Sequence, residues 1–364
     1  MSARNVFSNR GFRGVRLALA QELARHTGSG KAFRSLVDQD STPRQRLYSA
    51  LDIRRARLRM SVVAADVDFA GPRLINVRMS KGGTGKTTVA ANVASCMALM
   101  GLRCLLIDAD PQASLTTVYG INWAEADITH VGELMRRAYV GQDPCMRDAA
   151  WRIYEGGMLD IIPADISLAG ADAWLISASY RERTFAKLLE VERQFLSGYD
   201  VIIIDSAPGA SLLTTAITYG CRSILAVVAL NGHSVRAMEV LASNVQELNR
   251  HIEPPGIDVH IVANGYMAGY QSCLDSLEIL RGQFGDYLDD NILPHAAAFM
   301  RDMSVMAESD SGAVIEREPR SFGARAVIDL TNSLLDYYKV SLLPPNAAGR
   351  LPGRARKTKE RNVP

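Results

Sequence analysis

The chain has 364 residues, of which 48% are hydrophobic and 22% are charged, and its formal net charge is +2. This length and apolar content allow one large core with appendages, while the lack of an internal repeat and of a long apolar run excludes a solenoid and a membrane-spanning protein. No two cysteines have metal-ligand spacing, which argues against an iron–sulfur cluster and favours reduced, mostly buried thiols in a cytosolic protein; they are Cys96, Cys104, Cys145, Cys221 and Cys273.

The two ends of the chain are basic. Residues 1–70 contain thirteen basic residues against six acidic ones, and residues 344–364 contain six basic residues against Glu360 alone. The middle of the chain therefore carries the excess of acid. This division predicts three parts: a basic N-terminal region over 1–70, a folded domain over 71–343 and a basic, Pro- and Gly-rich tail over 344–364 for which disorder is the default.

The N-terminal region has a helical pattern. An apolar face that begins at Val15 is broken at Gly28-Ser29-Gly30, and Thr42 before Pro43 is a typical start for a second helix over 44–60. Arginines gather near the end of that second helix, at Arg54, Arg55, Arg57 and Arg59. This pattern fits part of a DNA-binding module, a dimerisation arm, or a basic helix packed on the core, and the sequence leaves these alternatives open.

The most informative stretch is Lys81-Gly82-Gly83-Thr84-Gly85-Lys86-Thr87-Thr88. It lies between an apolar run over 74–79 and a helical run over 89–100, which is the strand–loop–helix context of a loop that binds a nucleoside triphosphate. Glycines let the backbone N–H groups surround phosphate oxygens, and the helix adds its positive end. We expect Lys86 to bridge the β- and γ-phosphates, Thr87 to hold Mg²⁺ and Thr88 to reach the α-phosphate. Lys81 is an extra cation beside this anion site.

Two further apolar runs end in carboxylates. A strand-like run beginning at Cys104 ends in Asp108-Ala109-Asp110, so that both carboxylates lie on the same side of the chain. A second run over 200–204 ends in Asp205, followed by Ser206-Ala207-Pro208-Gly209. Continuous apolar residues predict strands covered on both faces, and ligands of parallel sheets bind where the strands end. Asp205 is thus a candidate to hold the Mg²⁺ water shell.

The rest of the domain alternates between strand-like and helical runs. We predict further strands over 159–163, 223–230 and 259–263, and helices over 180–196, 234–250 and 324–338. This alternation indicates an α/β fold with a mostly parallel sheet and helices on both faces. Asn264 follows the last of these strands, where it could face a nucleotide base or form a turn.

The three motifs, at 81–88, 108–112 and 205–208, together resemble the deviant Walker A ATPases of the ParA/MinD group. The run Asp108-Ala109-Asp110-Pro111-Gln112-Ala113-Ser114 is most similar to the ParA partition ATPases. The resemblance covers about residues 72–340; it is specific in the motifs and loose between them. A later segment, Asn291-Ile292-Leu293-Pro294-His295, is similar to the family's late strand, whose proline lies near the adenine.

The resemblance implies roles for the matching residues. Lys81 would contact phosphate across the interface of an ATP-sandwich homodimer, Asp110 would orient the attacking water, and Asp108 would support the magnesium site. Asp205 would be the Walker B carboxylate, and the four residues after it would form the second switch. Two prolines often follow this Asp in the family, whereas here the run is Ser206-Ala207-Pro208-Gly209, which leaves the role of this departure open.

The resemblance also implies a function. We expect a Mg²⁺-dependent ATPase that converts ATP to ADP and phosphate, binds DNA non-specifically as a homodimer and partitions or positions plasmid or chromosome cargo. A ParB-like adaptor would stimulate it in a bacterial cytoplasm, on the nucleoid and without a membrane partner, since the tail lacks the apolar face of a membrane-binding helix. Candidate DNA contacts are Arg301, Arg317, Arg320 and Arg325.

Two alternatives remain at this stage. The chain could be a DNA-binding regulator, such as an autorepressor, in which ATP is mainly a conformational ligand. It could also be a positioning ATPase for a protein assembly. The sequence does not identify the cargo or the partner protein.

Overall fold

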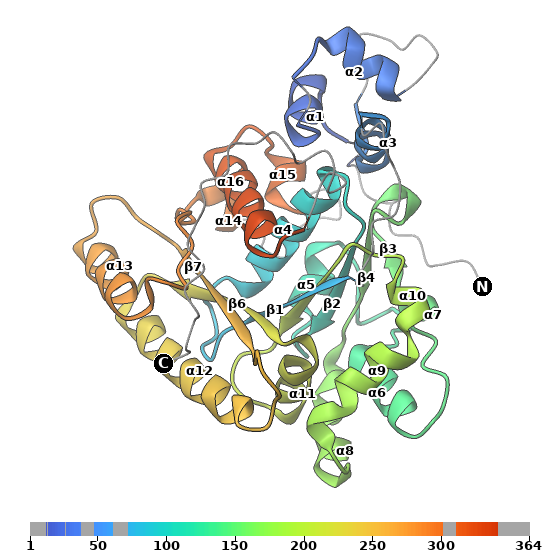
Figure 1. Cartoon of the computed structure of the whole chain (residues 1–364), viewed down its shortest axis with the longest axis vertical. Coiled ribbons are helices and arrows are strands. Elements are labelled where there is room, and N and C mark those ends of the chain that lie inside the picture. Colours follow the sequence, from blue (N-terminus) through green and yellow to red (C-terminus); the bar gives the residue numbers. More distant parts are fainter. Residues whose placement is uncertain are drawn as a thin grey trace.

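A central sheet organises the computed structural model, which describes residues 12, 14–25, 27–37, 47–60, 72–300 and 311–340 (Figure 1). The seven strands of this sheet have the order β3-β4-β2-β5-β1-β6-β7. Neighbouring strands are parallel except for β3 and β4. The strands are β1 (Arg73–Arg78), β2 (Cys104–Ala109), β3 (Trp151–Arg152), β4 (Leu159–Ile162), β5 (Val201–Ser206), β6 (Ser223–Ala229) and β7 (Asp258–Asn264).

The central strands are buried along their whole length. Every residue of β2 and of β5 is buried, as the unbroken apolar runs predict for a sheet covered on both faces. Asp108 and Asp205 lie opposite each other in the β2–β5 register. The parallel arrangement therefore brings both carboxylates, and the glycine-rich loop after β1, to one edge of the sheet. The predicted α/β class with a mostly parallel sheet is confirmed.

Helices cover the two faces of the sheet. One face packs on α4, α5, α15 and α16, through alternate strand residues such as Val77, Leu106 and Ile203. The opposite face packs on α6, α8, α9 and α11 beneath β2 and β5, and on α12 and α13 beneath β6 and β7 (Figure 1). The bounds are α4 (Lys86–Leu99), α5 (Ser114–Val118), α6 (Val131–Tyr139), α7 (Met146–Ala149), α8 (Ala171–Ser177), α9 (Thr184–Val191), α10 (Arg193–Leu196), α11 (Leu212–Cys221), α12 (Gly232–Asn249), α13 (Gln271–Phe284), α14 (Ala297–Met300), α15 (Val314–Arg317) and α16 (Phe322–Tyr337).

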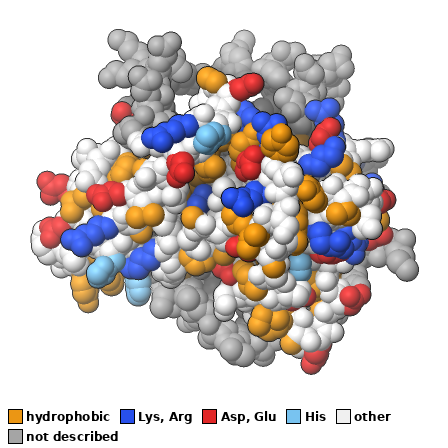
Figure 2. All heavy atoms as spheres, turned by 90° about the horizontal axis from the view of Figure 1, so that it is seen from below, with side chains coloured by type: hydrophobic (Ala, Val, Ile, Leu, Met, Phe, Trp, Pro, Cys, Tyr) orange, Lys and Arg blue, Asp and Glu red, His pale blue; other side chains and the backbone are white. Residues whose placement is uncertain are grey.

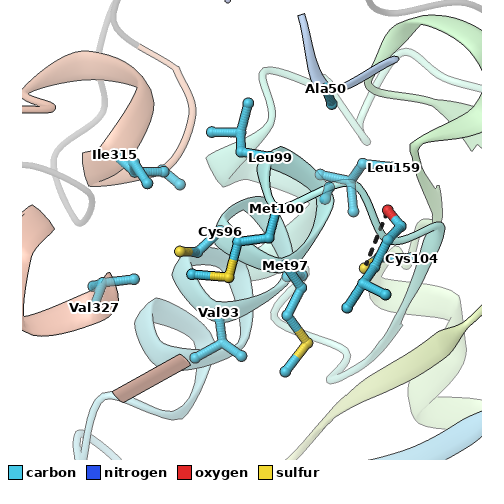
Figure 3. Close-up of a cluster of buried hydrophobic side chains, with 14 of the residues drawn as sticks. Ala50, Val93, Cys96, Met97, Leu99, Met100, Cys104, Leu159, Ile315 and Val327 are labelled. Atoms are coloured by element: carbon cyan, nitrogen blue, oxygen red, sulfur yellow. Dashed lines mark hydrogen bonds between the residues drawn. The ribbon is translucent and has the colours of Figure 1, made fainter. Parts of the chain in front are cut away.

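Helix α4 is the centre of the larger core. Nearly all of its residues are buried, and Figure 3 shows its side chains between Ile315 and Val327 on one side and Cys104 and Leu159 on the other. Ala50 of the N-terminal region reaches the same cluster. The helix that follows the glycine-rich loop is thus held from all sides, which fixes the loop at its start.

The N-terminal region packs on the outer side of this core as α1 (Leu17–Leu23), α2 (Gly30–Val37) and α3 (Ala50–Met60) (Figure 1). Arg54 of α3 donates to the Gly101 carbonyl at 2.8 Å and to Asp200 Oδ2 at 2.7 Å, and Arg57 donates to the Met100 carbonyl. These arginines therefore attach the region to the core of the folded domain. Helix α2 was not predicted, and the predicted break at residues 28–30 overlaps its first residue, Gly30.

Three predicted elements differ from the structure. The helix predicted over 44–60 begins at Ala50, and residues 38–46 lie outside the described residues. The helix predicted over 180–196 is divided into a short 3-10 turn (Arg181–Arg183), α9 and α10, with non-helical backbone at Glu192. The late strand expected at 291–295 is irregular, although Tyr266 and Pro294 form a single parallel bridge and Leu293 N–H donates to the Ala263 carbonyl.

No helix among the described residues is long and apolar enough to cross a membrane. The tail over 344–364 and Arg301 lie outside the described residues.

Candidate functional site

A cavity of about 910 Å³ opens at the carboxyl edge of the sheet. The glycine-rich loop and the start of α4 line it, together with Asp110, Pro208, Asn231, Asn264 and Pro294. The glycine-rich loop, Asp110, Asn264 and Pro294 of the predicted nucleotide site thus lie around one space, whereas Lys81, Asp108 and Asp205 are not among its lining residues. The volume is of the size usual for small-molecule sites, which span roughly 300–1,000 Å³.

The glycine-rich loop is held closed by Asn264. Its Nδ2 donates to the Thr84 carbonyl at 2.8 Å. Gly85 precedes α4 with φ of +91°, and a Cβ at this position would lie 2.2 Å from Asn264 Nδ2. Glycine is therefore required here for its conformation and for the close approach. Asn264 lines the cavity, and in this structure its amide fixes the loop backbone.

The start of α4 is a site for an anion. The first turn of α4 has no acidic residue and no side-chain cap. No negative charge of its own therefore balances the free N–H groups and the positive end of the helix dipole. Lys86 is only 6% exposed, and burial lowers its pKa against the opposing charges of Asp205 and Asp110. The buried hydroxyls of Ser80 and Thr84 have no hydrogen-bond partner. Bound phosphate oxygens would satisfy donors of this kind.

Thr87 and Asp205 form the second half of the site. The Thr87 hydroxyl donates to Asp205 Oδ2 at 2.6 Å, and the buried Oδ1 of Asp205 has no partner. Burial, and then the charge of Asp108, raise the pKa of Asp205 to about 8. An orphaned carboxylate oxygen beside a hydroxyl is the donor set that Mg²⁺ prefers, and a bound cation would reverse the pKa shift. The residues present therefore fit a magnesium ion.

Asp108 is directed toward the segment that follows β2, from Asp110 to the start of α5. Its Oδ1 accepts from the Asp110 N–H at 3.1 Å, and its Oδ2 accepts from the N–H and the hydroxyl of Thr116 at 2.9 and 2.7 Å. Burial raises its pKa to about 6, although these hydrogen bonds oppose the shift. Asp108 thus positions the backbone of Asp110 and the start of α5. Thr116 was not singled out from the sequence, because nothing in its surroundings indicates that contact.

Asp110 lines the cavity, and Lys81 contacts a residue that lines it. Lys81 Nζ donates to Asn231 Oδ1 at 3.3 Å, and Asn231 also caps the start of α12 by accepting from Ser234. Asp110 is half-buried, and its Oδ1 accepts from the Gln112 N–H at 2.9 Å. Asn231 was missed by sequence reasoning, and a turn-forming Asn between a strand and a helix is the signal that could have indicated it.

The candidate DNA-contacting arginines are not alike. Arg317 donates to the carbonyls of Gly312 and Ala298, and Arg325 pairs with Glu22 and Asp329. Arg320 is exposed. On the face opposite the N-terminal helices, basic and acidic side chains are interspersed (Figure 2). Arg320 and Arg325 are the exposed residues among the described candidates, and Arg325 is held in ion pairs, so Arg320 is the candidate best suited to contact a ligand.

The fold and this site define a P-loop nucleotide-binding protein. A parallel sheet, a glycine-rich loop closed by the next helix, and a Thr–Asp pair at the strand ends form the common framework of that class. A sequence model of the AAA domain family AAA_31 matches residues 72–256. The chain belongs to this family, the ParA/Soj/MinD type of P-loop ATPase.

Two relatives indicate the branch of the family. The chain is 27% identical over 262 residues to the sporulation initiation inhibitor protein Soj of Bacillus subtilis, a match that covers 72% of this chain and 98% of Soj. It is 29% identical over 226 residues to the chromosome partitioning protein ParA of Caulobacter vibrioides, covering 61% of this chain and 80% of that protein. Within the family, the chain is thus similar to proteins of the ParA/Soj type.

Solved structures show the same fold. An ATP complex of McdA from Cyanothece superposes with a TM-score of 0.60 at 16% identity, covering 72% of this chain and 96% of McdA. A cobyrinic acid a,c-diamide synthase from Mycobacterium smegmatis, with a bound ATP analogue and magnesium, gives 0.59 at 21% identity, covering 74% and 96%. The fold is therefore shared by proteins with different activities, and it does not by itself define the function.

Proposed function

We propose that this protein is an ATP-driven switch that partitions or positions cargo. ATP binding closes a homodimer with two sandwiched nucleotides, the dimer binds DNA without sequence preference, and hydrolysis to ADP and phosphate releases it. The observation that carries the proposal is the pairing of two lysines with one cavity. Lys86 is buried and lines this cavity, and Lys81, directly before the glycine-rich loop, contacts Asn231, which also lines it.

The first step is binding of the triphosphate. The backbone N–H groups of Gly82 to Lys86 and the positive end of α4 hold the phosphates, with Lys86 between the β- and γ-phosphates. The Thr88 hydroxyl is placed near the α-phosphate. Asn264 and Pro294 line the side of the cavity that we assign to the adenine.

The second step is hydrolysis. Thr87 and Asp205 would hold Mg²⁺, which supplies charge neutralisation to the phosphates when bound. Asp110 orients the attacking water, and Asp108 positions Asp110 through its backbone. Donors fixed before the reaction act on charge that develops in the transition state, so Lys86 and Lys81 supply much of the rate effect.

The third step is coupling to DNA and a partner. A ParB-like adaptor protein accelerates slow turnover, and the dimer resides on the nucleoid in the cytoplasm. Arg320 is the described candidate that we assign to phosphate contact, and the basic tail over 344–364 adds affinity through counterion release. The described N-terminal helices α1 to α3 act as a packed appendage of the core, because Arg54 and Arg57 of α3 are engaged there.

A DNA-binding titration tests the proposal. Binding of a random-sequence duplex is measured with ATP, with ADP and without nucleotide, at a series of salt concentrations. We expect binding with a steep salt dependence only with ATP, and a slope smaller by about one for Arg320→Ala. Arg73→Ala, an exposed arginine at the start of β1, is the matched control.

Other outcomes point to the two alternative functions. Binding that ignores the nucleotide and selects one duplex sequence would favour a regulator that reads an operator. Absence of DNA binding with intact ATP hydrolysis would favour a positioning ATPase for a protein assembly. Either result would overturn the DNA step of the proposal and leave the nucleotide site intact.

A further inference from the structure

A buried polar network lies behind the second switch. Asn76 and Arg78, two residues apart on β1, both face α11 and both donate to the Thr218 hydroxyl, at 3.1 and 2.8 Å. Thr218 in turn donates to the Thr214 carbonyl at 2.7 Å. A hydroxyl offers one donor and two acceptor sites, so Thr218 is saturated and its neighbours are fixed in place.

This network includes the residue after the Walker B carboxylate. The Ser206 hydroxyl donates to Asn76 Oδ1 at 2.7 Å. A side-chain hydrogen bond therefore joins the residue after Asp205 to the strand that leads into the P-loop. In this chain the end of β5 is connected to β1 through side chains.

Arg78 is a buried cation within this network. It is 1% exposed, and burial lowers its pKa to about 10, so it stays charged at neutral pH. No carboxylate pairs with it within the described parts of the chain, and its Nε has no partner. A buried ion without a counter-ion lowers stability.

The remaining contact of Arg78 suggests its role. Its Nη2 donates to the Gly209 carbonyl at 3.3 Å. Gly209 follows Pro208, which lines the nucleotide cavity, and has φ of +90°. On the other side, the Ala207 N–H donates to the Ala109 carbonyl at 3.3 Å. The loop over 207–210 is thus hydrogen-bonded to Arg78, the last residue of the strand that leads into the P-loop.

We propose that Arg78 is a positioning residue that fixes the second switch loop in its reactive arrangement. The inference deepens the proposed function, because it requires that the site hydrolyses ATP. Arg78 does not line the nucleotide cavity. It therefore affects the fraction of time for which the loop is correctly arranged, and it leaves nucleotide binding by the P-loop unchanged.

Steady-state kinetics separate these two effects. For Arg78→Met we expect kcat to fall about tenfold, the loss typical of one hydrogen bond to a charged donor, with KM for MgATP within about twofold. The thermal midpoint stays equal or rises, because an unpaired buried charge is removed. Arg78→Lys restores most of kcat, since an ammonium can donate to the same carbonyl. Arg73→Met, on the exposed start of the same strand, is the control and leaves kcat unchanged.

Hydrogen exchange of the nucleotide-free chain provides a second readout that does not depend on turnover. Amides over 207–211 exchange faster in Arg78→Met than in the wild type and in Arg73→Met, while those of α4 are unchanged. An unchanged kcat together with unchanged exchange would overturn the inference, and so would a rise in KM that accompanies a lower thermal midpoint. A wild-type chain that does not hydrolyse ATP would instead refute the proposed function, and the exchange comparison would still decide the role of Arg78.

Discussion

Lys81 donates a hydrogen bond to Asn231 within its own subunit, over 3.3 Å between Nζ and Oδ1. If Lys81 acts across a dimer interface, it must leave this partner when ATP closes the dimer. In the proposed cycle the contact is then a resting position, and its free energy would oppose closure of the dimer.

Release of Lys81 should favour the dimer. In Asn231→Ser the side chain is too short to hold Lys81 but still caps α12, because serine is a good N-cap residue. We expect the ATP concentration that half-saturates dimerisation to fall by roughly threefold, as for loss of one partly exposed hydrogen bond. Sedimentation velocity at a series of ATP concentrations measures it, and an unchanged or higher midpoint would contradict the resting-position account.

The Thr87–Asp205 pair predicts dependence on magnesium. A ligand at about 100 times its Kd stabilises the folded state by about 2.7 kcal/mol. We expect MgATP to raise the thermal midpoint of the wild type and EDTA to remove most of the rise. Asp205→Asn should retain the fold, because the substitution removes one of two adjacent buried carboxylates. In this variant ATP should raise the thermal midpoint only by the small amount seen for the wild type in EDTA, whether or not magnesium is present. A full MgATP shift in this variant would exclude Asp205 from the metal site.

Several elements could be predicted from the sequence because the signal is local. The glycine-rich loop, β2 and β5 have unbroken patterns whose environment depends on few distant residues. The resting contact of Lys81 joins residues 150 positions apart, and no local pattern encodes such a pairing. The hydrogen bond from the Thr116 hydroxyl to Asp108 also depends on how α5 packs against the end of β2. Arginines on a helix face suit DNA or a protein carbonyl equally well, so the docking of Arg54 became apparent only in the structure.

The attachment of the N-terminal region predicts a local effect on stability. Arg54 is 24% exposed and Asp200 13%, and Arg54 also donates to the Gly101 carbonyl. Arg54→Ala should lower the free energy of unfolding by about 1–3 kcal/mol and speed proteolysis within 1–60, without changing ATP affinity. The neighbouring Arg55→Ala is the control, because Arg55 is more exposed and its ion pair with Asp52 spans 3.8 Å. Equal effects of the two variants would show that Arg54 does not hold the region.

Asp289 predicts a pH dependence on the acid side. Burial alone would raise its pKa, but hydrogen bonds from His260, from the Asn291 backbone and from Ser333 outweigh burial, and the pKa is lowered from its ordinary value of 3.8. The native state therefore binds fewer protons at this group than the unfolded state. Its contribution to stability is present above the unfolded pKa and is lost as pH falls through the lower folded pKa.

The variant Asp289→Asn tests this sign. We expect the wild type to be more stable than the variant by about 1–3 kcal/mol near pH 6, with a difference that shrinks as pH falls below 3.8. Urea unfolding at several pH values measures it, with the exposed Asp286→Asn as control. A difference that grows toward low pH would contradict the assignment.

Mixing two inactive variants tests the central claim most directly, because it separates the subunit that supplies each lysine. Lys81→Ala and Lys86→Ala each lack one lysine at every site of their own homodimers. If Lys81 acts across the interface, a mixed dimer has one complete site, and an equal mixture should recover roughly a quarter of the wild-type ATP turnover with random pairing. If both lysines act within one subunit, no site in the mixture is complete, and turnover that stays at the level of the separate variants would contradict the account.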